Sequence, residues 1–117
     1  MGRLTTHVLD TARGKPAVGV RIDLDRIAQG GERQHLASTI TNADGRADAP
    51  LLDAAAFRPG QYELAFHIGD YFRAQASAGT AEAFLDVVPV RFTIAGDSHY
   101  HVPLLVTPWS YATYRGS

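Results

Sequence analysis

The stretch that decides the fold is His99–Ser117, which reads H-Y-H-V-P-L-L-V-T-P-W-S-Y-A-T-Y-R-G-S. Successive side chains of a strand point to opposite faces, so its first eight residues divide into two sets. One set is apolar, Tyr100, Val102, Leu104 and Val106, and the other is His99, His101, Pro103 and Leu105. The apolar face belongs to a core, and we expect the face with two imidazoles to look into solvent, a subunit contact or a site. Because proline has no N–H to donate, we expect a bulge or one missing backbone bond at Pro103.

The same alternation of apolar and polar residues recurs in short segments along the rest of the chain and predicts further strands. The predicted strands cover residues 4–10, 18–25, 32–41, 61–68, 87–94 and 110–115. In the first of them Thr5, His7 and Leu9 share one face, opposite to Leu4, Thr6 and Val8. Turn residues at 30–31, 42–45 and 96–97 separate the strands, and residues 11–17 read as a loop. Residues 51–59 read as irregular and apolar, with a short strand and a turn as the alternative.

A single short helix is predicted from Tyr71 to about Ala76, with Asp70 as its N-cap and Gly79 at its end. Residues 81–86 suit a helical turn as well as a loop. Short strands at turn-punctuated intervals, with one short helix, are typical of an antiparallel β-sandwich. We therefore predict an all-β protein of this class, with residues 1–117 forming one domain.

The composition is that of an ordinary globular chain, with 45% hydrophobic and 20% charged residues. The net charge of −1 gives no electrostatic reason to expect binding to nucleic acid or to an anionic membrane. The absence of cysteine excludes disulfides and thiolate catalysis. The N-terminus lacks the apolar region of a secretory signal, and no apolar run approaches the ~20 residues that span a bilayer. We expect a soluble protein of the cytoplasm.

The paired histidines are the strongest candidates for chemistry on pattern alone. His99 and His101 stand at i and i+2 on one face, which brings two titratable groups within reach of one ligand. They could donate two ligands to a metal, although no third ligand is evident, or they could pass a proton near neutral pH, since imidazole has a pKa of ~6.5. His7 and Arg46 read as surface and turn residues when taken alone. The pattern thus indicates a β-sandwich with a histidine and arginine site.

Three separated blocks of sequence carry a resemblance to a known family. They are L-T-T-H-V-L-D-T-A-R-G-K-P-A at 4–17, T-N-A-D-G-R at 41–46, and the closing stretch quoted above. In this order they resemble the 5-hydroxyisourate hydrolases, transthyretin-related enzymes of urate breakdown, over the whole length of the chain. The terminal Y-R-G-S distinguishes these enzymes from transthyretin, the hormone carrier on the same fold. Val106-Thr107 and Trp109-Ser110 stand where Leu-Ser and Phe/Tyr-Gly are commoner, beside the turn and away from the site.

The resemblance implies a transthyretin-like sandwich of about eight strands with a short helix. It also implies a homotetramer, a dimer of dimers, whose active sites lie at the dimer–dimer interface and take residues from more than one subunit. The implied reaction is hydrolysis of 5-hydroxyisourate to 2-oxo-4-hydroxy-4-carboxy-5-ureidoimidazoline in urate degradation, with no metal and no organic cofactor.

The resemblance also assigns roles to residues of this chain. The expected catalytic residues are His7, Arg46, His101 and Ser117, and the expected substrate contacts are His7, Arg46 and Tyr114. His99 is also an expected substrate contact, but the resemblance itself gives it no role. An imidazole from His7 or His101 would activate water, and the sequence does not decide which. Arg46 would hold the carbonyl or enolate edge of the substrate and stabilise oxyanion charge. The hydroxyls of Tyr114 and Ser117 would orient the ring.

Two other functions are compatible with parts of this pattern. A non-catalytic, transthyretin-like carrier would use the same channel for a small aromatic ligand, although His7, Arg46 and His101 place reactive polar groups where a carrier of an apolar hormone would have smoother walls. A metal-dependent enzyme would use His99 and His101 as ligands.

Overall fold

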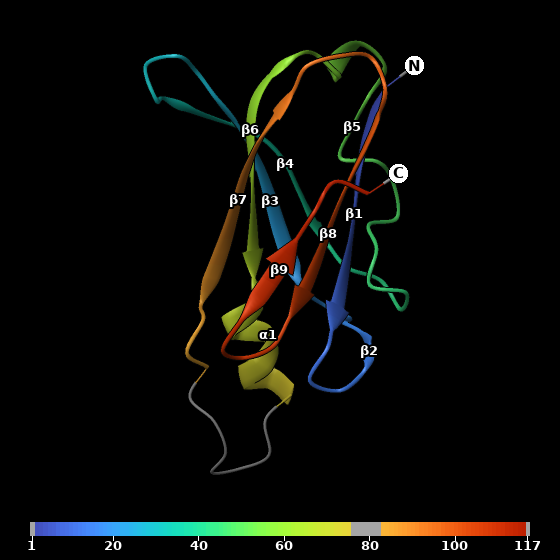
Figure 1. Ribbon diagram of the computed structural model, residues 1–117, viewed down its shortest axis with the longest axis vertical. Coiled ribbons are helices and arrows are strands. Elements are labelled where there is room, and N and C mark those ends of the chain that lie inside the picture. The colour runs from blue at the N-terminus through green and yellow to red at the C-terminus, as the bar shows by residue number, and fades with distance from the viewer. Residues whose placement is uncertain (1, 76–82, 117) are drawn as a thin grey trace.

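The computed structural model describes residues 2–75 and 83–116 and consists of two β-sheets packed face to face (Figure 1). The five-stranded sheet has the order β2 (Lys15–Pro16), β1 (Arg3–Asp10), β8 (His99–Val106), β9 (Tyr111–Thr113), and β5 (Leu52–Asp53) also pairs with β1. The four-stranded sheet has the order β4 (Arg33–Ile40), β3 (Arg21–Ile27), β6 (Gly60–His67), β7 (Val87–Ile94). A short 3-10 helix, η1 (Ala54–Ala56), follows β5, and α1 (Ile68–Gln75) follows β6. The predicted β-sandwich with one short α-helix is confirmed for the described residues.

The core lies between the sheets and is built from the inward faces of the strands. Leu4 and Val8 of β1 and Leu104 of β8 are fully buried, as are Leu24 of β3 and Leu64 of β6 from the other sheet. Most outward residues of β1 and β8 are only partly buried, and these are Thr5, His7, Leu9, His99, His101 and Leu105. Arg3 is exposed, and Pro103 is the one outward residue of these two strands that is buried. The predicted alternation in both strands is therefore confirmed, because each apolar face removes its side chains from water and leaves the polar face outside.

The central pair of the five-stranded sheet, β1 and β8, is parallel. Its register runs without a break from Arg3 opposite His99 to Asp10 opposite Val106. The other strand pairs among residues 2–75 and 83–116 are antiparallel, as predicted. Periodicity within a strand carries no information about the direction of its neighbour, so only the fold reveals that the first and the eighth strands run side by side in the same direction.

The sequence predicts a bulge or one missing backbone bond at Pro103, and the structure shows no bulge there. The register of β8 with β1 shows no shift at Pro103, which lies opposite His7. Its carbonyl oxygen accepts a hydrogen bond of 2.8 Å from the hydroxyl of Thr113. β8 can hold a proline in mid-strand because its paired residues on the β9 side begin only at Leu104.

Several predicted boundaries are wrong, because local pattern does not include the turn geometry. The second predicted strand begins at Arg21 rather than Val18, since Gly19 turns the chain with a φ of +84° and leaves Val18 48% exposed. The last strand is only Tyr111–Thr113. The predicted loop 11–17 contains β2. Residues 51–59 contain the short strand β5, as the alternative reading had it, followed by η1.

The helix begins earlier than predicted. It starts at Ile68, directly after β6, so Asp70 lies in its first turn and is not its N-cap. Ile68 is fully buried and continues the alternation of buried side chains in β6. The sequence pattern therefore does not show where the strand ends and the helix begins. Residues 83–86 are not helical, whereas Gly79 and residues 81–82 lie outside the described residues.

The helix is attached to the end of β1 by a buried polar contact. The hydroxyl of Tyr71 donates a hydrogen bond of 2.7 Å to the carboxylate of the buried Asp10. Burial and, to a smaller extent, the carboxylate of Asp10 raise the pKa of Tyr71, so its hydroxyl keeps its hydrogen and remains a donor.

No helix in the described part of the chain is long and apolar enough to cross a membrane.

Candidate functional site

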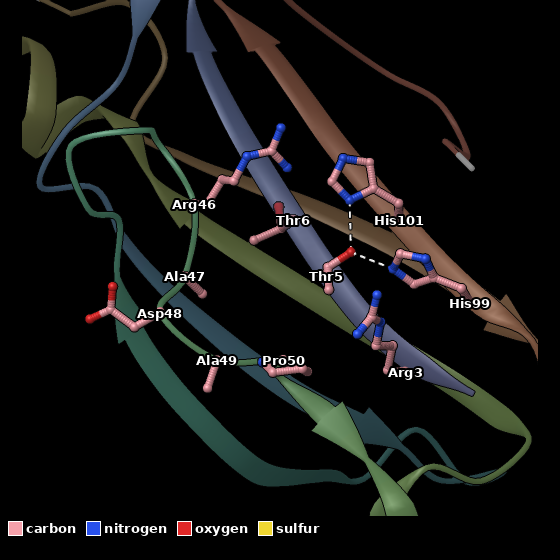
Figure 2. A pocket seen from close by; sticks show the side chains of 10 residues that line it. All are labelled: Arg3, Thr5, Thr6, Arg46, Ala47, Asp48, Ala49, Pro50, His99 and His101. Atoms are coloured by element: carbon pink, nitrogen blue, oxygen red, sulfur yellow. Dashed lines mark hydrogen bonds between the residues drawn. The ribbon is translucent and has the colours of Figure 1, made fainter. Parts of the chain in front are cut away.

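The outward faces of β1 and β8 form one surface of hydroxyl and imidazole groups. The parallel register places Thr5 opposite His101, with His99 two residues earlier on the same face. The hydroxyl oxygen of Thr5 lies 2.8 Å from Nε2 of His99 and 2.8 Å from Nδ1 of His101, as the dashed lines in Figure 2 show. The two imidazole rings, whose centres are 6.2 Å apart, are thus joined through one side chain of the neighbouring strand.

The turn 42–46 brings the second predicted block to this surface. The N–H of Val8 donates to the carbonyl of Gly45 at 2.8 Å, and His7 and Arg46 form an isolated antiparallel bridge. Within the turn, the side-chain oxygen of Asn42 accepts from the N–H groups of Asp44 and Arg46. These bonds hold the backbone of Arg46 against β1, so its guanidinium stands beside the histidines (Figure 2).

Gly45 is required at this contact for two reasons. Its φ is +75°, a region that residues with a Cβ rarely adopt. A Cβ at this position would also lie 2.4 Å from the carbonyl oxygen of Val8. The glycine of the N-A-D-G-R block therefore lets the turn approach β1 closely enough to place Arg46.

His7 is held by the same turn through its side chain. Its Nε2 lies 2.8 Å from the carbonyl oxygen of Asp44. A carbonyl oxygen can only accept, so Nε2 of His7 carries hydrogen and only Nδ1 of a neutral His7 can take a proton.

The closing Y-R-G segment returns to His101 from the other side. The N–H of Gly116 donates to the carbonyl of His101 at 2.7 Å, and a Cβ on Gly116 would lie 2.7 Å from Cδ2 of the imidazole. Arg115 lies over the ring of Tyr100 at 4.0 Å, whereas Tyr114 is 61% exposed. Ser117 lies outside the described residues.

A cavity of about 400 Å³ opens on this surface. Its wall includes Arg3, Thr5, Arg46, Asp48, His99 and His101 (Figure 2). A second, more open hollow of about 750 Å³ shares His99 and His101 and is completed by Tyr114, Arg115 and Gly116. The structure thus brings together Arg46, His99 and His101 in one wall and Tyr114 beside them. His7 is attached to Arg46 by its bridge but does not line either hollow.

The electrostatics of the site favour neutral imidazoles. Burial, followed by the charge of Arg46, lowers the pKa of His7, and the hydrogen bond to Asp44 opposes this only in part. Burial lowers the pKa of His101 as well, followed by Arg46, His99 and His7. Both rings are therefore neutral near pH 7 and can accept a proton, next to a guanidinium that can bind negative charge.

Arg3, Thr5 and Asp48 are among the residues of the cavity wall that sequence reasoning missed. Arg3 and Thr5 share the outward face of β1 with His7, so the alternation itself contained the signal. Asp48 follows the turn and accepts a hydrogen bond of 3.0 Å from the amide of Asn42. The sequence carried no signal for this residue, because its position depends on the path of the loop.

The geometry does not form a metal site from the paired histidines. One nitrogen of each ring is directed at the hydroxyl of Thr5, not at a shared ion position. Among residues 2–75 and 83–116, no three His, Cys, Asp or Glu side chains are placed to hold one metal ion. The sequence identified no third metal ligand to join His99 and His101, and none is found in this part of the chain.

Two facing sheets with a parallel β1–β8 pair, one short helix and a histidine and arginine cavity on the outer face of one sheet define a transthyretin-like sandwich protein. Comparison with known proteins is more specific. The chain belongs to the HIUase/Transthyretin family, whose family model matches residues 4–116.

Individual relatives in this family are similar over nearly their whole length. The chain is 60% identical to the 5-hydroxyisourate hydrolase of Mesorhizobium japonicum, covering 99% of this chain and 93% of the relative. It is 58% identical to 5-hydroxyisourate hydrolase 2 of Rhizobium meliloti, covering 99% and 97%. The solved structure of the Klebsiella pneumoniae 5-hydroxyisourate hydrolase superposes with a TM-score of 0.81, at 38% identity and over 100% of both chains. The family resemblance expected from the three sequence blocks is confirmed.

The influence of Arg46 on the two imidazoles can be measured without substrate. Arg46→Gln should raise the pKa of His7 and of His101 partway toward 6.5, because it removes a nearby positive charge and leaves the burial of both rings unchanged. The measurement is an NMR titration of the imidazole Cε1–H signals. Arg58→Gln, at an exposed arginine outside both hollows, is the charge-matched control. Unchanged histidine titrations in the Arg46 variant would contradict this account of the site.

Proposed function

We propose that this protein hydrolyses 5-hydroxyisourate to 2-oxo-4-hydroxy-4-carboxy-5-ureidoimidazoline, a step of urate degradation. The observation that carries the proposal is a cavity in which His101, an imidazole with a lowered pKa, stands beside Arg46. The named activity of relatives at 58–60% identity supports the choice of substrate. The cytoplasm stays the predicted compartment.

The chemistry of this step requires a base for water, positive charge for an oxyanion and a proton for the leaving nitrogen. Water attacks a carbonyl of the six-membered ring and loses a proton to an imidazole. A C–O bond forms, the lactam C–N bond breaks, and the protonated imidazole returns the proton to the ring nitrogen. A neutral imidazole beside a guanidinium can supply all three functions.

His101 suits the role of base better than His7. It lines both hollows, whereas His7 lines neither and already uses Nε2 to donate to the carbonyl of Asp44. Nδ1 of His101 is directed at Thr5, so Nε2 is the nitrogen left for water, and it lies on the far side of the ring from Thr5 in Figure 2. His7 then acts as a neighbour that helps to hold Arg46. Its contact with the substrate stays a prediction, because His7 lines neither hollow.

Arg46 suits the role of oxyanion partner. No carboxylate forms an ion pair with Arg46 among the described residues, whereas Arg33, Arg73 and Arg91 elsewhere in the fold are paired. Its guanidinium therefore presents planar, charged donors to the cavity. His99 lines both hollows and the exposed Tyr114 lines the second one, so both are positioned to contact the substrate ring. A hydroxyl contribution from Ser117 stays a prediction.

His101→Ala or Arg46→Ala should each lower the hydrolysis rate by ~10²-fold or more, because each removes a group that acts on the reacting atoms. The measurement is the loss of absorbance of freshly generated 5-hydroxyisourate. His35→Ala is the control, since His35 is exposed on β4 of the other sheet. Rates equal to that of the unchanged protein would refute the site assignment, and absence of activity in the unchanged protein would refute the proposed function.

The pH dependence of the rate should reflect the lowered pKa of His101. The base works only while it is neutral, and a lowered pKa keeps it neutral to more acidic pH. The rate should therefore remain high at pH 6.5 and fall only as the pH drops further. In Arg46→Ala, the residual activity should start to fall at higher pH, because a charge that disfavours protonation is gone. A profile that is flat through the acid range would count against an imidazole base.

We further propose that the working form is a homotetramer, a dimer of dimers with its sites at the dimer–dimer interface. Two observations support this: the cavity and the adjoining hollow lie on an open sheet face, and Trp109, Tyr111 and Tyr114 are large exposed side chains at or near the short edge strand β9. A second copy would enclose the substrate and cover these residues.

Light scattering on the purified protein should give four times the chain mass of 12.6 kDa. Dilution into a monomeric state should lower the activity, because a single chain leaves the cavity open to water. A monomer with full activity at all concentrations would contradict the proposed location of the sites.

A further inference from the structure

The hydroxyl of Thr5 occupies an unusual position between two imidazoles. Its oxygen is 2.8 Å from Nε2 of His99 and 2.8 Å from Nδ1 of His101. A hydroxyl has one hydrogen to donate and two lone pairs, so Thr5 either donates to one ring and accepts from the other or accepts from both rings. The hydrogen positions on the two histidines are therefore coupled when Thr5 donates to one of the rings, and two arrangements of neutral rings then satisfy both bonds.

In the first arrangement, His99 donates from Nε2 to Thr5, and Thr5 donates to Nδ1 of His101. The hydrogen of His101 is then on Nε2, the nitrogen that faces away from Thr5. In the second arrangement, His101 donates from Nδ1 to Thr5, and Thr5 donates to Nε2 of His99. Nε2 of His101 then carries a lone pair and can accept a proton. Of these two arrangements, only the second gives a base in the cavity. If both rings donate to Thr5, Nε2 of His101 is also free, but the hydroxyl hydrogen of Thr5 then has no acceptor among the described residues.

The charges around His101 stabilise the first and the second arrangement to different extents. Arg46 is the charged group with the largest influence on this ring, and it opposes added positive charge there. A nitrogen lone pair directed into a cavity with a guanidinium in its wall is attracted by that charge, whereas an N–H dipole in the same place is repelled. The arrangement with hydrogen on Nδ1 of His101 is the one that Arg46 stabilises.

We propose that Thr5 and His99 are positioning residues, which hold His101 with its hydrogen on Nδ1 and its unprotonated Nε2 facing the cavity. Thr5 accepts the Nδ1 hydrogen and passes its own hydrogen to His99, whose Nε2 is the acceptor at the end of the chain of hydrogen bonds. Neither residue touches the reacting atoms in this role. The catalytic consequence rests on the proposed hydrolysis, but the position of the hydrogen is a property of the free protein.

The decisive experiment is a ¹⁵N NMR measurement of the histidine tautomers in the free protein above the pH at which the rings protonate. In the unchanged protein His101 should carry its hydrogen on Nδ1. In Thr5→Val, which removes the hydroxyl and retains a side chain suited to a strand, His101 should lose this preference. His99→Phe, which removes the terminal acceptor, should have the same effect. Hydrogen on Nε2 of His101 in the unchanged protein, or the same tautomer in Thr5→Val, would overturn the proposal.

Kinetics provide a second and independent measurement. Thr5→Val should lower kcat by about tenfold with little change in KM, since substrate contacts remain and the base is correctly oriented for less of the time. Thr5→Ser restores the hydroxyl and should recover most of the lost rate. Thr93→Val, at an exposed position on β7 of the other sheet, is the matched control and should leave the rate unchanged.

The two measurements separate failure of this inference from failure of the proposed function. An unchanged protein without hydrolase activity, but with hydrogen on Nδ1 of His101, would refute the function and retain the hydrogen-bond assignment. An active protein in which Thr5→Val has an unaltered kcat would refute the positioning role and retain the function.

Discussion

The parallel pairing of β1 with β8 is the constraint on which the site depends. It joins two strands from opposite ends of the chain in an unbroken register from Arg3–His99 to Asp10–Val106. Since side chains alternate along both strands, this register puts Thr5, His99 and His101 on one outward face. A shift of one residue in either strand would turn its outward set into the core and separate the two imidazoles from the hydroxyl that joins them.

The turn 42–46 places the positively charged side chain of Arg46 beside this face. Its approach depends on backbone groups, the N–H of Val8 and the carbonyl of Gly45, and on a glycine that leaves room for the contact. The side chain of Asn42 fixes the turn internally. Arg46 is thus placed by backbone contacts. Among residues 2–75 and 83–116 no carboxylate pairs with it, which leaves its charge for a ligand.

Burial and charge act in the same direction on the imidazoles. Partial burial disfavours the protonated ring, and the nearby guanidinium disfavours it further, so the pKa values of both His7 and His101 are lowered. The same guanidinium favours a lone pair over an N–H at the cavity side of His101. In the proposed mechanism, one arginine therefore influences the protonation of the base, the position of the hydrogen on its ring and the stabilisation of negative charge on the substrate.

Local alternation in the sequence was sufficient to predict the sandwich, the inward faces of β1 and β8, and the exposure of His99 and His101. The three-block resemblance added His7, Arg46 and Tyr114, of which the structure places Arg46 in the cavity wall and His7 and Tyr114 beside it. Neither source predicted the start of α1 at Ile68, the unbroken register at Pro103 or the role of Thr5. These depend on turn geometry and on which strands are neighbours. The sequence by itself determined which side chains leave the core, because that follows from the period of a single strand. Only the tertiary structure decided which of them meet, because register and strand direction are set by contacts between residues about a hundred positions apart.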